Sequence, residues 1–313
     1  MKPDNLLLKR CCQFLTALST CAALTLSSST SVAVASQPDR CVDISQVRDA
    51  DIQRNAGFFL KFPTQFCISV SSFAEHGVEW SITIVREIKT TRQGAKVPTI
   101  FLLHDNEQSA FDTALYAVQK YGGKLVAIEA RDKRIFGKQD PNRNFGSKSS
   151  DTNTCRDMRV KPAPVFTKFL AGLRDKKRNI VITLHNNADG FAGGGGSGTI
   201  SADRQSKVMR GMRAPNVKND PDDALLLAGR PVFDANSAAK KITKKMHKAG
   251  INVIYEHVTK AGNDCSFSNY VVLNKLGQYY NIEAQQGHTR QQKRMLDVLM
   301  KHLGYRVRFN QDL

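Results

Sequence analysis

The tetrad His104-Asp105-Asn106-Glu107 carries two side chains that could bind one metal ion. It follows the apolar run 97–103 and precedes a helix-like segment, 108–121. A histidine and a glutamate three positions apart at the end of a strand can both face one divalent ion, and catalytic zinc sites commonly use three protein ligands. A second apolar strand, 179–184, delivers His185 at its end, where open α/β sheets place their sites. His185 is therefore the expected third ligand.

Two further groups could handle a substrate. Asn142 and Arg143 form a pair whose planar guanidinium fork suits a substrate carboxylate. Glu283 lies at the end of the predicted strand 279–283 and could serve as a general base toward water. A lone His-x-x-Glu pair is usually a turn of a surface helix. The prediction of a functional site therefore depends on the combination of groups, all of which are expected at strand ends.

In this order, the motifs resemble those of the zinc metallocarboxypeptidases of the funnelin type, together with relatives that deacylate amino acids, the aspartoacylases and succinylglutamate desuccinylases. The shared pattern is His-x-x-Glu, then Asp-x-Asn-Arg-Asn, then a strand ending in His, then a late Glu, over about residues 97 to 303. The polar loop 147–155, which ends in a cysteine, is similar to the corresponding carboxypeptidase loop.

Carried over by position, the resemblance implies one Zn²⁺ held by His104, Glu107 and His185. It implies that Asn142 and Arg143 bind a carboxylate and that Glu283 is the general base. Two assignments stay open. Both Arg131 and Arg134 could stabilise an oxyanion, with Arg134 favoured, and the family's tyrosine has four candidates: Tyr255, Tyr270, Tyr279 and Tyr280.

The other histidines are not assigned to zinc. They are His257, His288 and His302. Asp189, shortly after His185, could orient a ligating imidazole, although a simple turn also explains it.

The N-terminus predicts export. Lys9 and Arg10 precede an apolar segment, 11–26, and Ala33-Val34-Ala35 supplies a small-x-small cleavage signal, so residues 1–35 are interpreted as a secretory signal peptide. The apolar segment is shorter than the ~20 residues that a membrane-spanning helix needs, and we therefore expect no transmembrane anchor after cleavage. The expected location is secreted or periplasmic.

Cysteine usage agrees with this location. Three of the seven cysteines lie in the predicted signal peptide, which leaves Cys41, Cys67, Cys155 and Cys265. Four cysteines allow three pairings. Proximity along the chain favours Cys41 with Cys67, and hence Cys155 with Cys265.

Charge suggests anionic partners. The chain has 46 Lys and Arg against 28 Asp and Glu, a formal net charge of +18. Basic surfaces can bind nucleic acid, but export favours an anionic envelope polymer or an acidic peptide. A solvated basic helix face accounts for much of the excess; its lysines are Lys240, Lys241, Lys244, Lys245 and Lys248.

The pattern of helices alternating with strands predicts an α/β fold, a single domain with a mixed β-sheet and helices on both faces. We expect an N-terminal extension and first strands over 36–96, irregular up to 62, and a catalytic core over 97–313. Expected strands are 66–70, 80–88, 124–128, 251–258 and a hairpin of 270–273 with 279–283; expected helices are 165–173, 236–248 and 289–303. Between 186 and 229 the pattern breaks down around a glycine-rich run, which predicts a loop beside the cleft.

The sequence therefore predicts an exported zinc-dependent hydrolase that cleaves an amide bond next to a free carboxylate, a carboxypeptidase or amidase acting on peptides such as those of the cell wall. One alternative is an N-acyl amino acid deacylase. Another is a catalytically silent envelope-binding protein with the same fold, which the presence of every core residue disfavours.

Overall fold

The computed structural model describes residues 40–88, 96–147, 155, 162–188, 200–215 and 220–308. The predicted signal peptide, Asp189 and the glycine-rich run lie outside these residues. Within the described part of the chain, no helix is long and apolar enough to cross a membrane.

Nine strands in the described residues form one mixed sheet in the order β1-β2-β4-β3-β5-β9-β7-β8-β6. They are β1 (Phe66–Glu75), β2 (Val78–Glu87), β3 (Thr99–Leu102), β4 (Lys124–Glu129), β5 (Ile180–Asn187), β6 (Met209–Met212), β7 (Ala224–Gly229), β8 (Asn252–His257) and β9 (Gln278–Gln285). The central strands β4, β3, β5 and β9 run parallel. Their carboxyl ends therefore share one edge of the sheet.

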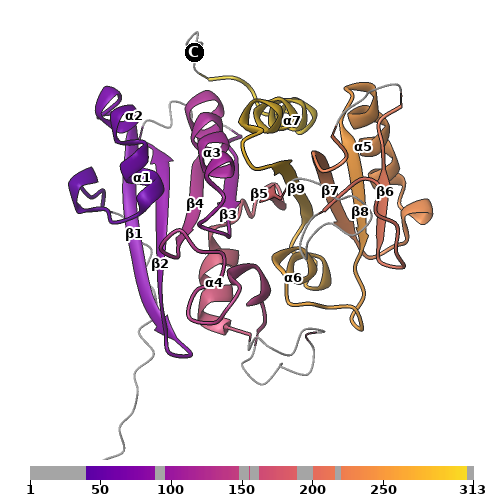
Figure 1. The fold of residues 1–313 in the computed structure, drawn as a ribbon, viewed down its shortest axis with the longest axis horizontal. Helices are drawn as coiled ribbons and strands as arrows, with labels where there is room; N and C mark the ends of the chain where they lie inside the picture. Colours follow the sequence, from indigo (N-terminus) through magenta and orange to yellow (C-terminus); the bar gives the residue numbers. More distant parts are fainter. Residues whose placement is uncertain are drawn as a thin grey trace, which may run out of the picture. The chain divides into compact units, whose positions relative to one another are not determined.

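Helices cover both faces of the sheet, as the sequence predicts (Figure 1). Side chains of α1 (Ala50–Arg54), α2 (Ala56–Lys61), α3 (Gln108–Tyr121), α5 (Ser237–Lys248) and α7 (Thr289–His302) belong to one hydrophobic cluster. Those of α4 (Pro164–Leu173) and α6 (Phe267–Leu273) belong to a second cluster on the opposite face. Three short 3-10 turns complete the described elements: η1 (Ile44–Gln46), η2 (Pro141–Arg143) and η4 (Phe233–Ala235).

Most predicted elements are confirmed within a few residues, but three expectations are wrong. The predicted hairpin over 270–283 is the helix α6 followed by β9, because Ser266 caps the helix and β9 pairs with β5 and β7 instead. Residues 36–62 are not irregular throughout, since η1, α1 and α2 lie in this range. Strands β6 and β7 lie in the range 186–229.

Local packing fixes the start of β9, the strand that carries Glu283. Gly277, the residue before β9, has a φ of 138°, and a Cβ there would lie 2.0 Å from the carbonyl oxygen of Asn179. Only glycine fits this close approach. The next residue, Gln278, donates its backbone N–H to the same carbonyl at 2.7 Å, which sets the register of β9 on β5.

Candidate metal centre

Two adjacent parallel strands bring the three predicted ligands together. Strand β3 ends at Leu102, and His104 and Glu107 follow in the turn that leads into α3. His185 lies on β5, which pairs directly with β3. The turn is held in place because the Asp105 side chain accepts hydrogen bonds from the backbone N–H groups of Ala130 and Asp132. Burial raises the pKa of Asp105 to about 6, against the effect of these bonds.

The ligand atoms of His104, Glu107 and His185 converge on one point. Glu107 places its two carboxylate oxygens 2.8 Å from Nδ1 of His104 and 2.9 Å from Nδ1 of His185. The two Nδ1 atoms are 3.1 Å apart. All three side chains are buried, each no more than 5% exposed. This is the arrangement of three ligands that could hold one metal ion.

The hydrogen bond at Nε2 of His104 leaves the lone pair of its Nδ1 available to a metal ion. Nε2 of His104 lies 2.8 Å from Oδ1 of Asp140, and a carboxylate there favours the tautomer with the proton on Nε2. In this tautomer, the lone pair of Nδ1 points toward a Glu107 carboxylate oxygen and the second imidazole nitrogen, an arrangement that a bound cation would stabilise. The residues therefore fit a metal: Nδ1 of His185 faces the same carboxylate, and within the part of the chain that the structure describes its buried Nε2 has no hydrogen-bond partner.

Electrostatics keep the carboxylates of the centre ionised. Burial opposes ionisation of Glu107, but the imidazoles of His185 and His104 hold its pKa well below the usual range. Burial likewise opposes ionisation of Asp140, yet its hydrogen bond to His104 and the nearby Arg143 and Arg134 lower its pKa to about 2. Asp140 is the first residue of the Asp-x-Asn-Arg-Asn pattern, and its contact with His104 cannot be predicted from spacing alone, because it depends on the path of the loop 131–140.

Glu283 lies beside His185 in the sheet. The two residues are directly paired on the parallel strands β5 and β9, so their side chains share one face. Glu283 is 5% exposed, and its Oε1 accepts a hydrogen bond from the Asn281 side-chain amide at 2.8 Å. Burial raises the pKa of the Glu283 carboxyl. His185 and Glu283 both lie inside their strands, so the expectation that every site group ends a strand is wrong.

Of the two candidate arginines, Arg134 lies at the centre. Its Nη1 donates to Oε1 of Glu107 at 3.1 Å, and its charge also acts on Glu283. Arg131 instead lies over the ring of Phe136, 5.8 Å from its centroid. The role of Arg134 at an oxyanion stays a prediction.

Asn142 and Arg143 lie on the 3-10 turn η2, directly after Asp140. The Asn142 side-chain oxygen accepts from the backbone N–H of Phe267 at 3.2 Å, which ties η2 to the start of α6. Nε of Arg143 lies 3.3 Å from Oδ2 of Asp264, and its side chain keeps 32% of its surface exposed. Burial disfavours the charged guanidinium, but Asp264, Asp140 and Glu256 raise the pKa of Arg143.

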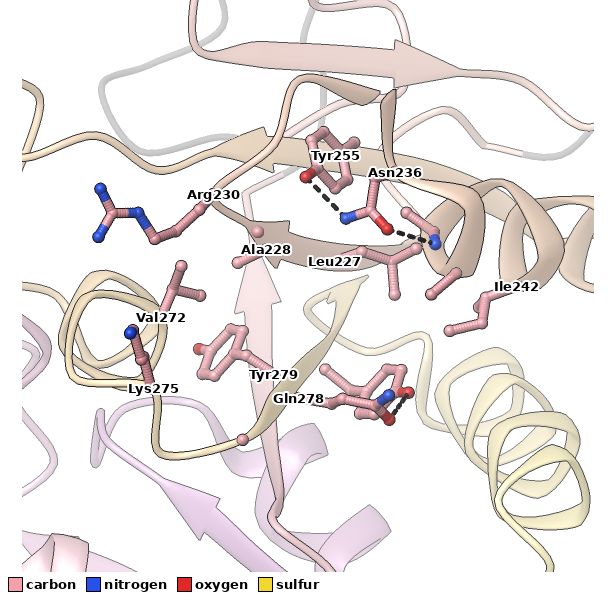
Figure 2. A pocket seen from close by; sticks show the side chains of 15 residues that line it. Leu227, Ala228, Arg230, Asn236, Ile242, Tyr255, Val272, Lys275, Gln278 and Tyr279 are labelled. Atoms are coloured by element: carbon pink, nitrogen blue, oxygen red, sulfur yellow. Dashed lines mark hydrogen bonds between the residues drawn. The ribbon is translucent and has the colours of Figure 1, made fainter. Parts of the chain in front are cut away.

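The four tyrosines occupy different environments. The hydroxyl of Tyr279 lies 2.8 Å from that of Thr183, and burial, with the charges of Glu256 and Glu283, raises the pKa of Tyr279 above its usual range. Tyr255 and Tyr280, together with Tyr279, line a pocket of about 260 Å³, where Asn236 donates to the Tyr255 hydroxyl (Figure 2). The ring of Tyr270 packs on Phe145. Tyr279 thus shares the surroundings of Glu283.

The remaining candidates lie elsewhere. His288 faces Asp223, 3.1 Å from its carboxylate, and neither His257 nor His302 belongs to the metal-ligating group. Asp189 lies outside the described residues.

No protein-family model matches the chain, and no curated protein matches its sequence. Among solved structures, the chain is similar to carboxypeptidase A from Helicoverpa armigera, with 11% identity, 85% of this chain and 76% of that chain covered, and a TM-score of 0.45. It is also similar to a candidate metallopeptidase from Shewanella amazonensis SB2B, with 12% identity, 84% and 97% covered, and a TM-score of 0.45. A candidate metallopeptidase from Shewanella denitrificans OS217 gives 10% identity, 81% and 89% covered, and a TM-score of 0.44.

Proposed function

We propose that this protein is an exported zinc-dependent hydrolase that cleaves an amide bond next to a free carboxylate, acting as a carboxypeptidase or amidase on peptides. The observation that carries the proposal is the convergence of His104, Glu107 and His185 within hydrogen-bond distance, with Glu283 beside His185 on the neighbouring strand. A cluster that served only the fold would not need a second buried glutamate at this position.

The donor set favours zinc. Two imidazole nitrogens and one carboxylate are a typical ligand set of catalytic zinc sites, whereas magnesium and calcium prefer oxygen donors. When bound, zinc supplies Lewis-acid polarisation of a carbonyl and lowers the pKa of water.

The residues around the centre supply the rest of the chemistry. Glu283 accepts the proton of the attacking water and returns it to the leaving amine, a cycle that its raised pKa supports. Arg134, at Glu107, stabilises the negative charge that develops on the carbonyl oxygen. Arg143 binds the terminal carboxylate of the substrate and so selects the adjacent amide bond, while Asn142 holds the loop that carries Arg143.

Export is supported by the two disulfides, Cys41–Cys67 and Cys155–Cys265, both of which the sequence predicts. Structural disulfides are typical of oxidising compartments. In such a compartment, peptides, including cell-wall peptides, are more available than cytoplasmic acylated amino acids. The excess of basic over acidic residues would also hold the protein near an anionic envelope polymer.

Product analysis of the zinc-loaded protein tests the proposal. Peptides with a free terminal carboxylate, the same peptides amidated, cell-wall fragments and N-acyl amino acids are incubated in parallel and analysed by mass spectrometry. We expect release of the terminal residue from the free acids and little cleavage of the amides. In Arg143→Lys, which keeps the charge but loses the bidentate fork, this preference should fall. Exclusive cleavage of N-acyl amino acids would instead identify a deacylase, and binding without any cleavage a silent protein.

A further inference from the structure

A pocket lies between β7 and β9, at the end of β9 away from the candidate metal centre (Figure 2). The pairing of the two strands ends at Ala228 with Tyr279. Beyond this pair, the carbonyl oxygen of Gly229 accepts from the backbone N–H of Val258, the residue after β8. Gln278, at the start of β9, donates instead to the residue before β5. Each strand end is thus bonded to the neighbour on its outer side, and the pocket of about 260 Å³ opens between the two.

The walls of this pocket are mainly apolar and come from both faces of the sheet. Five lining side chains, each no more than 8% exposed, belong to β7, α5, α6 and β9: Leu227, Ala239, Ile242, Val272 and Tyr280. The hydroxyls of Tyr255 and Tyr280 are already engaged, because they donate to the Pro231 carbonyl and the Gln278 side chain. Apolar surface that enters such a pocket is removed from water, which favours binding. The volume is below the ~300–1,000 Å³ of pockets that hold drug-sized molecules, so the occupant has to be small.

The charged side chains of the lining are both cationic. Arg230, after β7, and Lys275, after α6, line the pocket and are exposed (Figure 2). No acidic side chain is among the described residues that line it, and neither cation has an ion pair within the described part of the chain. Asp234, an acid close to Arg230 in the sequence, is already paired with Arg210 at 2.9 Å. The two positive charges at the pocket can therefore bind an anion.

We propose that this pocket binds a small organic acid, whose apolar body lies between α5 and α6 and whose carboxylate contacts Arg230 and Lys275. Guanidinium and ammonium groups both donate charge-assisted hydrogen bonds to a carboxylate. Because the two cations are exposed, the carboxylate keeps part of its hydration while the apolar body is buried. Roughly 17 Å of strand separate Gln278 from Glu283, so this site is distinct from the candidate metal centre. The inference does not depend on the proposed hydrolase.

The test compares hexanoate with hexanamide, which has the same apolar chain without the charge. Each is titrated calorimetrically into the zinc-loaded protein without the predicted signal peptide. Hexanoate should bind at least about fivefold more tightly, the scale that two partly exposed ion pairs supply. The double variant Arg230→Gln, Lys275→Gln should reduce this ratio to below about twofold. The double variant Lys244→Gln, Lys248→Gln, on exposed residues of α5 outside the pocket, removes the same net charge and should preserve the ratio.

A variant that fills the pocket tests its apolar part. Ala238 is an exposed residue of α5 that lines the pocket, so Ala238→Phe adds a ring there without changing a buried residue. It should weaken the binding of hexanoate and of hexanamide alike, by at least about fivefold. The thermal unfolding midpoint should stay at the parent value in all of these variants, because every substituted residue is exposed.

Arg143→Gln distinguishes this pocket from the proposed carboxylate anchor, and hexanoate should bind to this variant as tightly as to the parent. Hexanoate binding that is lost in Arg143→Gln would place the acid at the candidate metal centre and overturn the proposal. Equal binding of hexanoate and hexanamide would overturn it as well, as would a preference for hexanoate that survives in Arg230→Gln, Lys275→Gln. Unchanged binding in Ala238→Phe would also contradict it. Selective binding of hexanoate without cleavage of any peptide would support this site and contradict the proposed hydrolase.

Discussion

At the residue scale, the candidate centre depends on two imidazoles whose Nδ1 atoms face each other 3.1 Å apart across one carboxylate. A metal ion bound by both Nδ1 atoms would stabilise this close approach of the two rings. We predict that His185→Ala and His104→Ala each lose most of the bound zinc, because two remaining ligands bind far more weakly than three. Elemental analysis of the purified protein measures this. His302→Ala, on α7, is the matched control and should keep its zinc; equal zinc in all three variants would refute the ligand set.

Sequence and structure differ most clearly in what surrounds these ligands. His104, Glu107 and His185 could be proposed from the sequence because ligand type, spacing and an apolar strand before each motif are all local features. The contacts of Asp140 with His104 and of Asp264 with Arg143 could not, because each depends on how segments distant in the sequence meet in the fold.

At the element scale, the segment around the start of α6 is tied to η2 by two contacts and to Cys155 by a disulfide. Cys265 is bonded to Cys155, Asp264 pairs with Arg143, and the backbone of Phe267 donates to Asn142. Replacing Cys155 and Cys265 with serine should loosen this segment, raising KM severalfold while zinc is retained, and should lower the free energy of unfolding by roughly 2–5 kcal/mol. Steady-state kinetics and thermal unfolding measure the two effects.

The other disulfide is the matched control. Cys41–Cys67 ties the segment before η1 to the start of β1, an edge strand of the sheet. Its double serine variant should lose stability and keep the parent KM. If both variants raised KM equally, the Cys155–Cys265 bond would have no special role at the site.

The same segment shows where sequence reasoning about elements fails. Strands and long helices were predictable because their apolar periodicity is strong, as in α3, α5 and α7. Residues 267–273 contain aromatic and β-branched side chains that favour a strand, yet they form a helix, because Ser266 caps it and its apolar side chains pack on the sheet. Tertiary packing overrides a weak local preference there.

At the scale of the whole molecule, the basic surface contrasts with two acidic side chains that are shielded from solvent, the buried Asp51 on α1 and the half-buried Glu129 on β4. The lysines of the predicted basic face, Lys240, Lys241, Lys244, Lys245 and Lys248, are all exposed on α5, which buries Ile242 and Met246 instead. By contrast with these exposed lysines, Asp51 and Glu129 are shielded from solvent, and burial raises the pKa of each to about 7.

These raised pKa values predict how stability depends on pH. A carboxyl whose pKa is higher in the folded than in the unfolded protein destabilises the fold when it is ionised. For these two groups, this loss of stability is absent below about pH 4 and complete above about pH 7. Stability should therefore fall as the pH rises from 5 to 8. Asp51→Asn removes one such group and should raise the unfolding midpoint at pH 8 by roughly 3 °C or more, and by only about a third as much at pH 5. Thermal unfolding across this range measures it, and an equal shift at both pH values would contradict the assignment.

The central claim is that Glu283 is the base of a metal-dependent hydrolase, and one measurement on Glu283→Gln tests it most directly. Zinc content and turnover of a free-acid peptide are determined on the same zinc-loaded sample, with Glu79→Gln, on an exposed residue of β2, as control. Glutamine keeps the size of the side chain and leaves His104, Glu107 and His185 intact, so zinc should remain at one ion per chain. Turnover should fall at least about a hundredfold, the scale of lost general-base catalysis, while the control stays near the parent. Full turnover in Glu283→Gln with zinc in place would contradict the account.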